Sequence, residues 1–420
     1  MVINKHTLSN GLTIVHSPDK NTKMVAVNML YKVGSRNESE SMTGFAHLFE
    51  HLMFGGSINI PDYDTPLQLA CGENNAFTTC DYTNYYITLP SANIETAFWL
   101  ESDRMLSLAF TPESLEVQRN VVMEEFKQHY LNQPYGDLSH IMAAMAYKRH
   151  PYRWPTIGLK LDHIKDAKME DVKDFFQRHY RPDNAILSVV GNIGFEETIS
   201  LAEKWFGEIE KRTSNLKTRA VINDFIPEEP EQKRQRRKTV YRNVPNDLLY
   251  MSFTICKRTD KDFHACDMIS DILANGRSSR LYRKLVEQEK LFTSLDAYIS
   301  ARTDKGQLFI VGMPAEGINI NDAEAAIWKE IDNLRHEAAS SEELDKLKNK
   351  YEANDSLEKT DYQHRAAQLA YFEMYGDAAM IDNEVENYRA VTPEMLKKAC
   401  RKYLLKKNSC ILHYLARKNT

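Results

Sequence analysis

The chain has few of the features that mark secreted, membrane-spanning or nucleic-acid-binding proteins. Its six cysteines form no C-x-x-C pair, which argues against a cysteine zinc site and suits reduced thiols in the cytoplasm. No apolar run approaches the length of a membrane span, and no apolar signal core follows the first residues. The net charge of −5 is too small to indicate a nucleic acid or a membrane as the partner. We therefore expect a cytoplasmic protein, or a periplasmic one if a signal peptide has been removed.

Length and composition indicate a globular protein with more than one domain. The chain has 420 residues, of which 42% are hydrophobic and 27% are charged, and this is the usual composition of a globular protein. A single hydrophobic core rarely serves a chain of this length, so two or more domains are expected.

The most informative stretch is T-G-F-A-H-L-F-E-H-L-M-F-G, residues 43–55. In a helix, His47 and His51 lie one turn apart on the same face, where two imidazoles can hold one metal ion. Glu50 precedes the second histidine and is near enough to reach a water at that metal. The arrangement H-x-x-E-H is typical of a zinc hydrolase.

Two core histidines with ordinary hydrogen-bond partners are the alternative explanation of this motif. The helix is apolar nearly all round, so we expect it to be buried. Burying two histidines and a glutamate without partners is costly, and a bound metal would remove that cost. The sequence therefore favours a metal site. Ser41 or Thr43 is the expected N-cap of the helix, and Gly55-Gly56-Ser57 is its expected end.

A catalytic zinc keeps three protein ligands and one position for water, so a third ligand is needed. A carboxylate from another buried helix would serve, and the candidates are Glu73, Glu116, Glu124 and Glu125. The helix expected at 113–130 carries an apolar stripe made of Val117, Val121, Val122 and Phe126. Gln118 and Glu125 lie two turns apart on one face of that helix, while Glu124 points about 100° away from Glu125. Spacing alone does not choose among these carboxylates.

Residues 72–90 are rich in Thr, Tyr and Phe and predict two short strands that turn near Cys80-Asp81. Polar groups on both faces suit an edge strand that can pair with an incoming peptide, and an ordinary surface hairpin is the alternative. Upstream, residues 5–16 predict a hairpin around Asn10-Gly11, and Met24–Val33 predicts a buried strand.

The second half of the chain repeats the order of elements in the first. The strand expected at Leu248–Cys256 corresponds to Met24–Val33, and the helix and strand at 392–415 correspond to those at 172–190. The second copy has no H-x-x-E-H. Residues 211–238 are poor in apolar side chains and contain K-R-Q-R-R-K, which we interpret as a solvated linker or strand and not as a nucleic-acid patch.

These patterns predict an α+β fold with two homologous α/β-roll domains of about 200 residues each. Each domain is expected to have a mixed antiparallel sheet with helices packed on one face. We expect a zinc-binding catalytic domain at 1–212, a linker at 213–238 and a domain without the zinc motif at 239–420.

The motif, the two-copy layout and the segment R-N-V-V-M-E-E resemble the pitrilysin family of inverzincins, which includes insulin-degrading enzyme and mitochondrial processing peptidase. The resemblance covers the whole chain and is strongest over residues 8–130. In that family the third ligand lies on a helix of the form E-R-x-x-V-x-x-E, and the run from Arg119 places Glu125 there. Most relatives carry a supporting glutamate two turns earlier, where this chain has the uncharged Gln118. The resemblance implies one Zn²⁺ per chain, held by His47, His51 and Glu125, with Glu50 as the catalytic base.

The same resemblance implies how a peptide would be held. The family adds its substrate as a β-strand beside an N-A-x-T edge strand, and here the similar residues are Asn75, Ala76, Phe77 and Thr78. Active single-subunit relatives also hold the substrate with an Arg and a Tyr in a segment like L-R-E-x-x-G-L-x-Y. The matching segment here, residues 285–293, reads L-V-E-Q-E-K-L-F-T, with Val286 and Thr293 in those two places.

The resemblance implies a zinc-dependent metalloendopeptidase that hydrolyses unfolded peptides within a dimeric clamshell chamber. Because the Arg/Tyr pair is missing, we expect the zinc-bearing subunit of a heterodimer whose other, homologous subunit carries that pair. A homodimer is the alternative assembly. A non-catalytic assembly or peptide-binding subunit that retains the motif is the alternative function.

Overall fold

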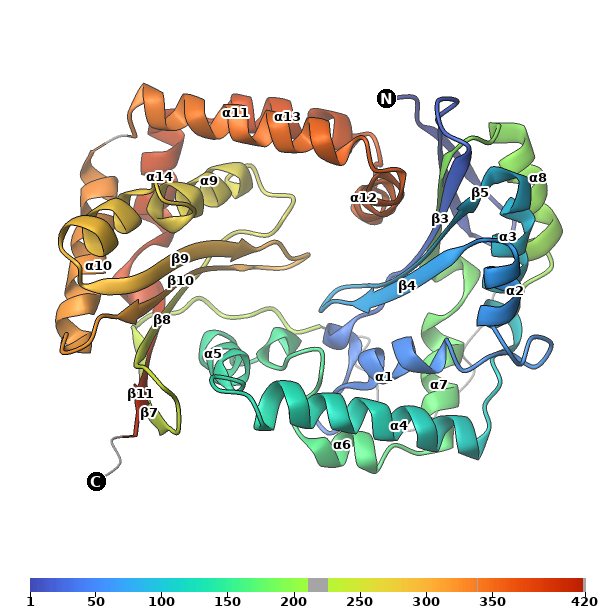
Figure 1. Ribbon diagram of the computed structural model, residues 1–420, viewed down its shortest axis with the longest axis horizontal. Coiled ribbons are helices and arrows are strands. Elements are labelled where there is room, and N and C mark those ends of the chain that lie inside the picture. The colour runs from blue at the N-terminus through green and yellow to red at the C-terminus, as the bar shows by residue number, and fades with distance from the viewer. Residues whose placement is uncertain (211–225, 338, 418–420) are drawn as a thin grey trace. The chain divides into compact units, whose positions relative to one another are not determined.

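The computed structural model describes residues 1–210, 226–337 and 339–417. Most of the predicted linker, from 213 to 225, lies outside the described residues. Contacts divide the chain into two compact units, whose elements are labelled in Figure 1. The first unit comprises residues 1–128, 154–227 and 355–383, and the second comprises 129–153, 228–354 and 384–420.

The first unit is built on a six-stranded sheet with the strand order β1-β2-β6-β3-β5-β4, of which Figure 1 labels β3, β4 and β5. Its strands are β1 (Asn4–Thr7), β2 (Thr13–Pro18), β3 (Met24–Tyr31), β4 (Glu73–Thr78), β5 (Thr83–Pro90) and β6 (Ala185–Gly191). Neighbouring strands are antiparallel except β2 and β6, which are parallel. The predicted hairpin around Asn10-Gly11 and the predicted buried strand from Met24 are confirmed. β4 is an edge strand, as predicted, so among the described residues one side of its backbone pairs with no other strand.

Helices from the first half of the chain cover one face of this sheet. They are α1 (Phe45–Leu52), α2 (Asp64–Leu69), α3 (Ile94–Ser107), α4 (Pro112–Phe126), α6 (Leu161–Lys165), α7 (Met169–His179) and α8 (Phe195–Phe206). The main core of the unit joins Val27 and Met29 of β3 to Phe49 of α1, Phe98 of α3 and Phe175 of α7. All five side chains are buried, so α1 rests on a rigid apolar base.

The opposite face of the same sheet is covered by α12 (Tyr362–Met374), which comes from the second half of the chain. Side chains alternate along a strand, so Ala26 and Leu30 point away from the main core. They pack against Ala366 and Leu369 of α12. The sequence predicts helices on one face of the sheet. This added layer was not predicted, because an amphipathic pattern does not reveal which sheet a helix covers.

The second unit is built on a five-stranded sheet with the order β7-β11-β8-β10-β9, in which only β7 and β11 are parallel. Its strands are β7 (Arg236–Arg242), β8 (Leu248–Thr254), β9 (Phe292–Ser300), β10 (Gln307–Pro314) and β11 (Ser409–Ala416). Its helices are α5 (Leu138–Ala146), α9 (Phe263–Ala274), α10 (Ile320–His336), α14 (Pro393–Tyr403) and most of α11 (Ser341–Glu358) and α13 (Met380–Arg389). A single core joins β8 and β10 to α9, α10, α11 and α14.

Two helices are exchanged between the halves of the sequence. α5 comes from the first half and packs on β8 and β11 of the second unit, where the Ser252 hydroxyl donates to the Met142 sulfur at 3.2 Å. α12 comes from the second half and packs on the first sheet. The compact units therefore differ from the predicted sequence repeats at 1–212 and 239–420, and the repeat boundaries stay a prediction.

Other differences between prediction and structure are local. The end of the predicted linker forms the start of β7. α13 was not predicted. α4 ends at Phe126, and the chain continues as a π-helical segment, Lys127–Leu131, where an α-helix to residue 130 was expected. Among the described residues, no helix combines the length and the hydropathy that crossing a bilayer requires.

Candidate metal centre

The start of α1 is fixed by a buried carboxylate from the preceding loop. Glu38 is 1% exposed, and its two oxygens accept from the backbone N–H groups of Gly44 at 2.9 Å and Ala46 at 2.8 Å. These are N–H groups that a helix leaves without a partner in its first turn. Burial raises the pKa of Glu38 to about 8, although the same backbone donors act to lower it.

The N-cap prediction at Ser41 or Thr43 is wrong. The residue at the N-cap is Gly44, with a φ of 88°, a conformation that favours glycine. A Cβ there would lie 2.5 Å from the Ile164 side chain. Thr43 instead accepts from the backbone N–H of Leu159 at 2.7 Å and bonds His163 at 2.8 Å. No cap pattern in the sequence indicated Glu38, because it reaches the helix from six residues before Gly44.

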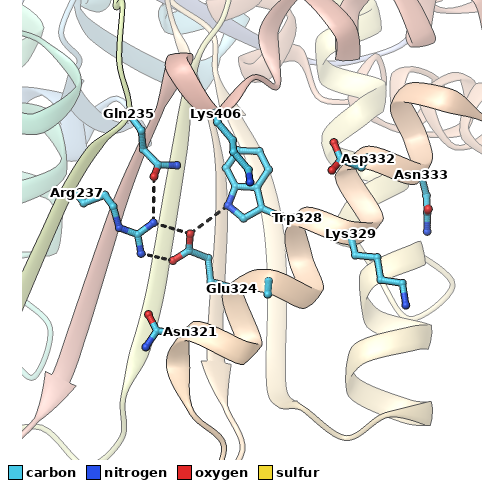
Figure 2. Close-up of a pocket in the computed structure, with 10 residues that line it drawn as sticks. Gln235, Arg237, Asn321, Glu324, Trp328, Lys329, Asp332, Asn333 and Lys406 are labelled. Atoms are coloured by element: carbon cyan, nitrogen blue, oxygen red, sulfur yellow. Dashed lines mark hydrogen bonds and ion pairs between the residues drawn. The ribbon is translucent and has the colours of Figure 1, made fainter.

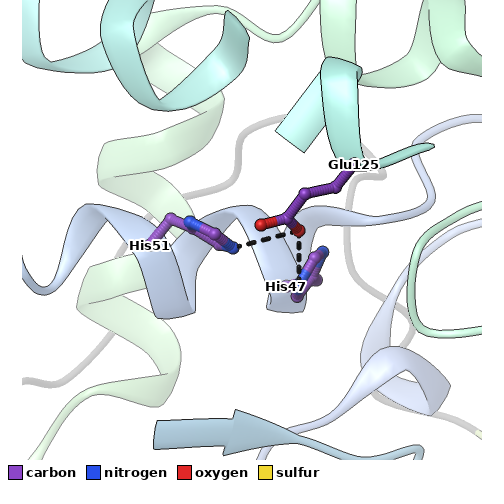
Figure 3. A group of neighbouring side chains, drawn as sticks. All are labelled: His47, His51 and Glu125. Atoms are coloured by element: carbon purple, nitrogen blue, oxygen red, sulfur yellow. Dashed lines mark ion pairs between the residues drawn. The ribbon is translucent and has the colours of Figure 1, made fainter. Parts of the chain in front are cut away.

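His47, His51 and Glu125 lie together at the meeting of α1 and α4 (Figure 3). The Nε2 atoms of both histidines lie 3.5 Å from Oε2 of Glu125. Two ligands of a tetrahedral zinc, with bonds of about 2.0–2.1 Å, lie about 3.4 Å apart. The imidazole rings are perpendicular, with centroids 4.9 Å apart. The donor set and its spacing therefore fit a zinc ion.

The structure shows which of the four candidate carboxylates lies beside the two histidines, a choice that sequence spacing left open. Among the described residues, Glu125 is the one carboxylate grouped with both histidines. Glu124 is exposed and accepts from Lys127 at 2.6 Å, and Glu116 pairs with Arg119. Glu73 is exposed at the start of β4.

The predicted apolar stripe of α4 is partly wrong. Leu115, Val122 and Phe126 are its buried residues, whereas Val117 and Val121 are 57% and 40% exposed. Gln118 is half-buried, two turns before Glu125, and its side chain forms no hydrogen bond with any residue that the structure describes. The helix is held instead by Arg119, whose guanidinium donates to the Ala167 carbonyl at 2.5 Å.

Glu50 lies beside His51 on α1 and reaches toward β4. The Thr78 hydroxyl donates to Oε2 of Glu50 at 2.5 Å. Burial raises the pKa of Glu50, and the bond from Thr78 lowers it part of the way back. A half-buried carboxylate with a raised pKa next to a metal site is suited to accept and release a proton during catalysis.

The four residues predicted to bind peptide all lie on β4 and alternate in direction. Asn75 and Phe77 are exposed, whereas Ala76 and Thr78 are half-buried. Ala76 packs against the core that carries α1. The Asn75 carboxamide accepts from the backbone N–H of Ala76 at 2.8 Å. The contact between Thr78 and Glu50 was not predicted from the sequence.

A buried ion pair lies in the same core and was also missed by the sequence analysis. Arg104 and Glu101 of α3 are 2% and 0% exposed and form an ion pair. The Arg104 guanidinium lies 4.4 Å from the ring centroid of Tyr85 on β5, and the Tyr85 hydroxyl bonds that of Tyr180 at 3.1 Å. This packing fixes β5, the strand that supports β4.

The second unit has a polar cavity of about 540 Å³ next to α10, which Figure 2 shows. Glu324 accepts there from Arg237 at 2.8 Å and from the Trp328 indole at 3.1 Å, and it bonds His413 at 2.8 Å. Burial raises the pKa of Glu324, but the bonds from His413 and Arg237 outweigh it and lower the pKa to about 2. These groups satisfy one another, so this cavity is a weaker candidate site than the His-His-Glu cluster.

Two family profiles match the chain. Residues 13–158 match the profile described as insulinase, peptidase family M16, and residues 166–351 match the one described as the peptidase M16 inactive domain. The segment with the His-His-Glu cluster lies within the first match. The second match covers much of the second half, including Val286 and Thr293.

Similar proteins carry zinc protease names. "Zinc protease PqqE" of Helicobacter pylori is 32% identical over 77% of this chain and 72% of its own length. The "Uncharacterized zinc protease YmxG" of Bacillus subtilis is 25% identical over 74% of this chain and 73% of its own length. A probable mitochondrial-processing peptidase subunit beta of Schizosaccharomyces pombe is 31% identical over 50% of this chain and 46% of its own.

Solved structures share the whole fold. The crystal structure of a protease from Helicobacter pylori has a TM-score of 0.91 and 27% identity, with 99% of each chain covered. The M16 inactive domain from Pseudomonas fluorescens has a TM-score of 0.87 at 16% identity, over 100% of this chain and 99% of that one, which is a likeness of fold alone. Taken with the profile matches and the 32% identity to a zinc protease, these findings show that the chain belongs to the M16 family of peptidases.

Proposed function

We propose that this chain is a zinc-dependent metalloendopeptidase that hydrolyses unfolded peptides. The observation that carries the proposal is the His47–His51–Glu125 cluster, with ligand-like spacing of 3.5 Å, beside the Glu50 carboxylate. The cluster would hold one zinc ion per chain. The zinc protease names of similar proteins support the choice of metal.

Bound there, zinc would act as a Lewis acid that polarises the scissile carbonyl and lowers the pKa of the attacking water. His47, His51 and Glu125 would hold the ion. Glu50 would take a proton from the attacking water and deliver it to the amine nitrogen of the leaving peptide. Its raised pKa favours this role, because a base with a pKa nearer to the working pH can both accept and return the proton.

The substrate would bind as an added strand beside β4. Its edge position leaves one side of the β4 backbone without a strand partner in the sheet, and main-chain hydrogen bonds to such an edge require an extended peptide. Asn75, Ala76, Phe77 and Thr78 would lie along that peptide. A folded protein presents few extended segments, so we expect unfolded chains or peptides as substrates.

The chain would act with a second subunit. Val286 is half-buried in the segment Tyr282–Gln288, and Thr293 on β9 bonds the Met313 carbonyl at 3.2 Å. Neither supplies a guanidinium or a phenol for the substrate. We propose a heterodimer whose homologous partner carries that Arg/Tyr pair, with a homodimer as the alternative, and a cytoplasmic location.

Metal analysis joined to peptide cleavage tests the function. The purified chain, alone and with its candidate partner, should hold one zinc per chain and cleave an internally quenched peptide in a chelator-sensitive manner. Glu50→Gln should keep the zinc and lose cleavage by more than about 100-fold, since removing a catalytic base commonly has an effect of 10²–10⁴. Glu124→Gln, an exposed neighbour of the site, is the matched control.

Cleavage by Glu50→Gln at the wild-type rate would refute the assignment of the base. Full zinc occupancy with no cleavage of any unfolded substrate, in the presence of the partner, would instead favour a non-catalytic assembly or peptide-binding subunit.

A further inference from the structure

The Thr78 hydroxyl forms a bond to Glu50 that the proposed mechanism does not require. Thr78 is the last residue of β4, the strand proposed to hold the peptide, and Glu50 lies on α1, the helix that carries the two histidines. The bond joins the two elements at 2.5 Å, a length typical of a charge-assisted hydrogen bond to a carboxylate.

The hydrogen bonds around Thr78 determine where its single proton goes. The Thr83 hydroxyl is fully buried and donates to the Val33 carbonyl at 2.9 Å. The Thr78 oxygen lies 3.4 Å from the Thr83 oxygen and 2.5 Å from Glu50. A carboxylate at the shorter distance is the stronger acceptor, so the Thr78 hydroxyl donates its hydrogen bond to Glu50. This leaves Oε1 of Glu50 to accept the proton of the attacking water.

The backbone beneath Thr78 is well fixed. Thr78 pairs directly with Thr83 in the antiparallel ladder of β4 and β5. β5 in turn pairs with β3 at the centre of the sheet. Glu50 has several rotatable bonds, and a carboxylate without a hydrogen-bond partner would sample several rotamers. Thr78 therefore ties this side chain to the paired backbone of β4 and β5.

We propose that Thr78 is a positioning residue, which holds Glu50 in register with the strand that binds the substrate. This inference rests on the proposed peptidase function. A peptide on β4 would have its scissile bond fixed relative to that strand, and the Thr78 bond fixes the base relative to the same strand. Substrate and base are thus both positioned by β4, and the distance between them does not depend on the flexibility of the Glu50 side chain.

The exchange Thr78→Val tests the proposal, because valine keeps the shape and the β-branch of threonine but removes the hydroxyl. We expect kcat to fall by about 10–100-fold, the effect of a misplacement of about 1 Å, with KM changed by less than about threefold. Thr78→Ser restores the hydroxyl and should bring kcat back to within about threefold of wild type. Zinc affinity, measured by competition with a chelator, should be the same in all three proteins, since Thr78 is not a ligand.

The control is Thr88→Val on β5, which makes the same exchange opposite Glu73 at the other end of β4 and should leave kcat unchanged. Crystal structures add a readout that does not depend on activity. The Glu50 carboxylate should move in Thr78→Val and return in Thr78→Ser.

An unchanged Glu50 position, an unchanged kcat in Thr78→Val, or no recovery in Thr78→Ser would each overturn the proposal. A wild-type chain that cleaves no peptide, even with its partner, would overturn the proposed function, and this inference with it. A cleaving wild type whose Thr78→Val variant is equally fast would overturn this inference alone.

Discussion

Replacing Glu38 should lower the free energy of unfolding, because this carboxylate stabilises the start of α1, and it leaves the proposed metal ligands unchanged. In Glu38→Ala, the N–H groups of Gly44 and Ala46 lose acceptors that lie at 2.9 and 2.8 Å. Each buried donor left without a partner costs about 1–3 kcal/mol, so the free energy of unfolding should fall by about 2–6 kcal/mol. Glu38→Gln keeps one carbonyl oxygen as an acceptor, so near pH 5 its free energy of unfolding should fall by about half as much as that of Glu38→Ala.

The pH dependence of this effect has a definite sign. The pKa of Glu38 is about 8 in the folded chain and near 4.5 when the chain is unfolded. Between these values the folded state binds more protons, so the stability that Glu38 contributes is fully present below pH 4.5 and falls as the pH rises toward 8. The loss between pH 5 and pH 8 is about 3 kcal/mol. Glutamine does not titrate, so the free energy of unfolding of Glu38→Gln should rise by this amount relative to that of the wild type as the pH rises.

Urea unfolding of the metal-free full chain, followed by tryptophan fluorescence at pH 5 and pH 8, measures both effects. The exposed Glu40 supplies the control Glu40→Ala. A destabilisation by Glu38→Ala no larger than that of Glu40→Ala would refute the capping role. A constant difference between wild type and Glu38→Gln at the two pH values would refute the raised pKa.

Two further predictions concern the metal and acid stability. Glu125→Gln should raise the zinc Kd by more than about 100-fold, since even groups that only support ligands contribute about 10–100-fold; a competition assay in which Glu124→Gln weakened binding equally would exclude Glu125 as a ligand. His179 is buried beside Phe175, and burial, with Arg178 and Arg181, lowers its pKa to about 3. The unfolded chain protonates this histidine below 6.5, so stability should fall by about 2 kcal/mol between pH 7.5 and pH 5. Glu38 changes the stability with pH in the opposite direction, so the matched comparison is His179→Gln against the wild type at both pH values. Equal losses of stability in the two proteins between pH 7.5 and pH 5 would refute the prediction.

The sequence allowed the helix with the two histidines to be predicted because its pattern is local. His47 and His51 are brought together by one helical turn, which the chain order alone ensures. Glu125 comes from a different helix, and it was chosen through family resemblance, since spacing gave four equivalent carboxylates. The edge strand was predictable from its composition, because Thr, Tyr and Phe with Pro90 at the end leave few alternatives to a short hairpin.

Contacts that depend on tertiary folding could not be read from the sequence. Glu38 caps α1 through a loop, and the usual cap residues nearby, Ser41 and Thr43, made a wrong prediction attractive. The stripe of α4 was misplaced because valines were assumed to be buried, whereas Val117 and Val121 face solvent. The Thr78–Glu50 bond requires β4 and α1 to meet, and no spacing along the chain contains that information.

The exchanged helices have a consequence for the order in which the chain is made. Ala26 and Leu30 of the first sheet are covered by α12, whose residues are translated long after the end of β6. At roughly 5–20 residues per second, this interval lasts roughly 10–40 s. During that time the nascent first half displays an apolar face of the kind that chaperones bind and that promotes aggregation. A gene divided between its two halves would leave this face of the first product uncovered until the second product bound to it.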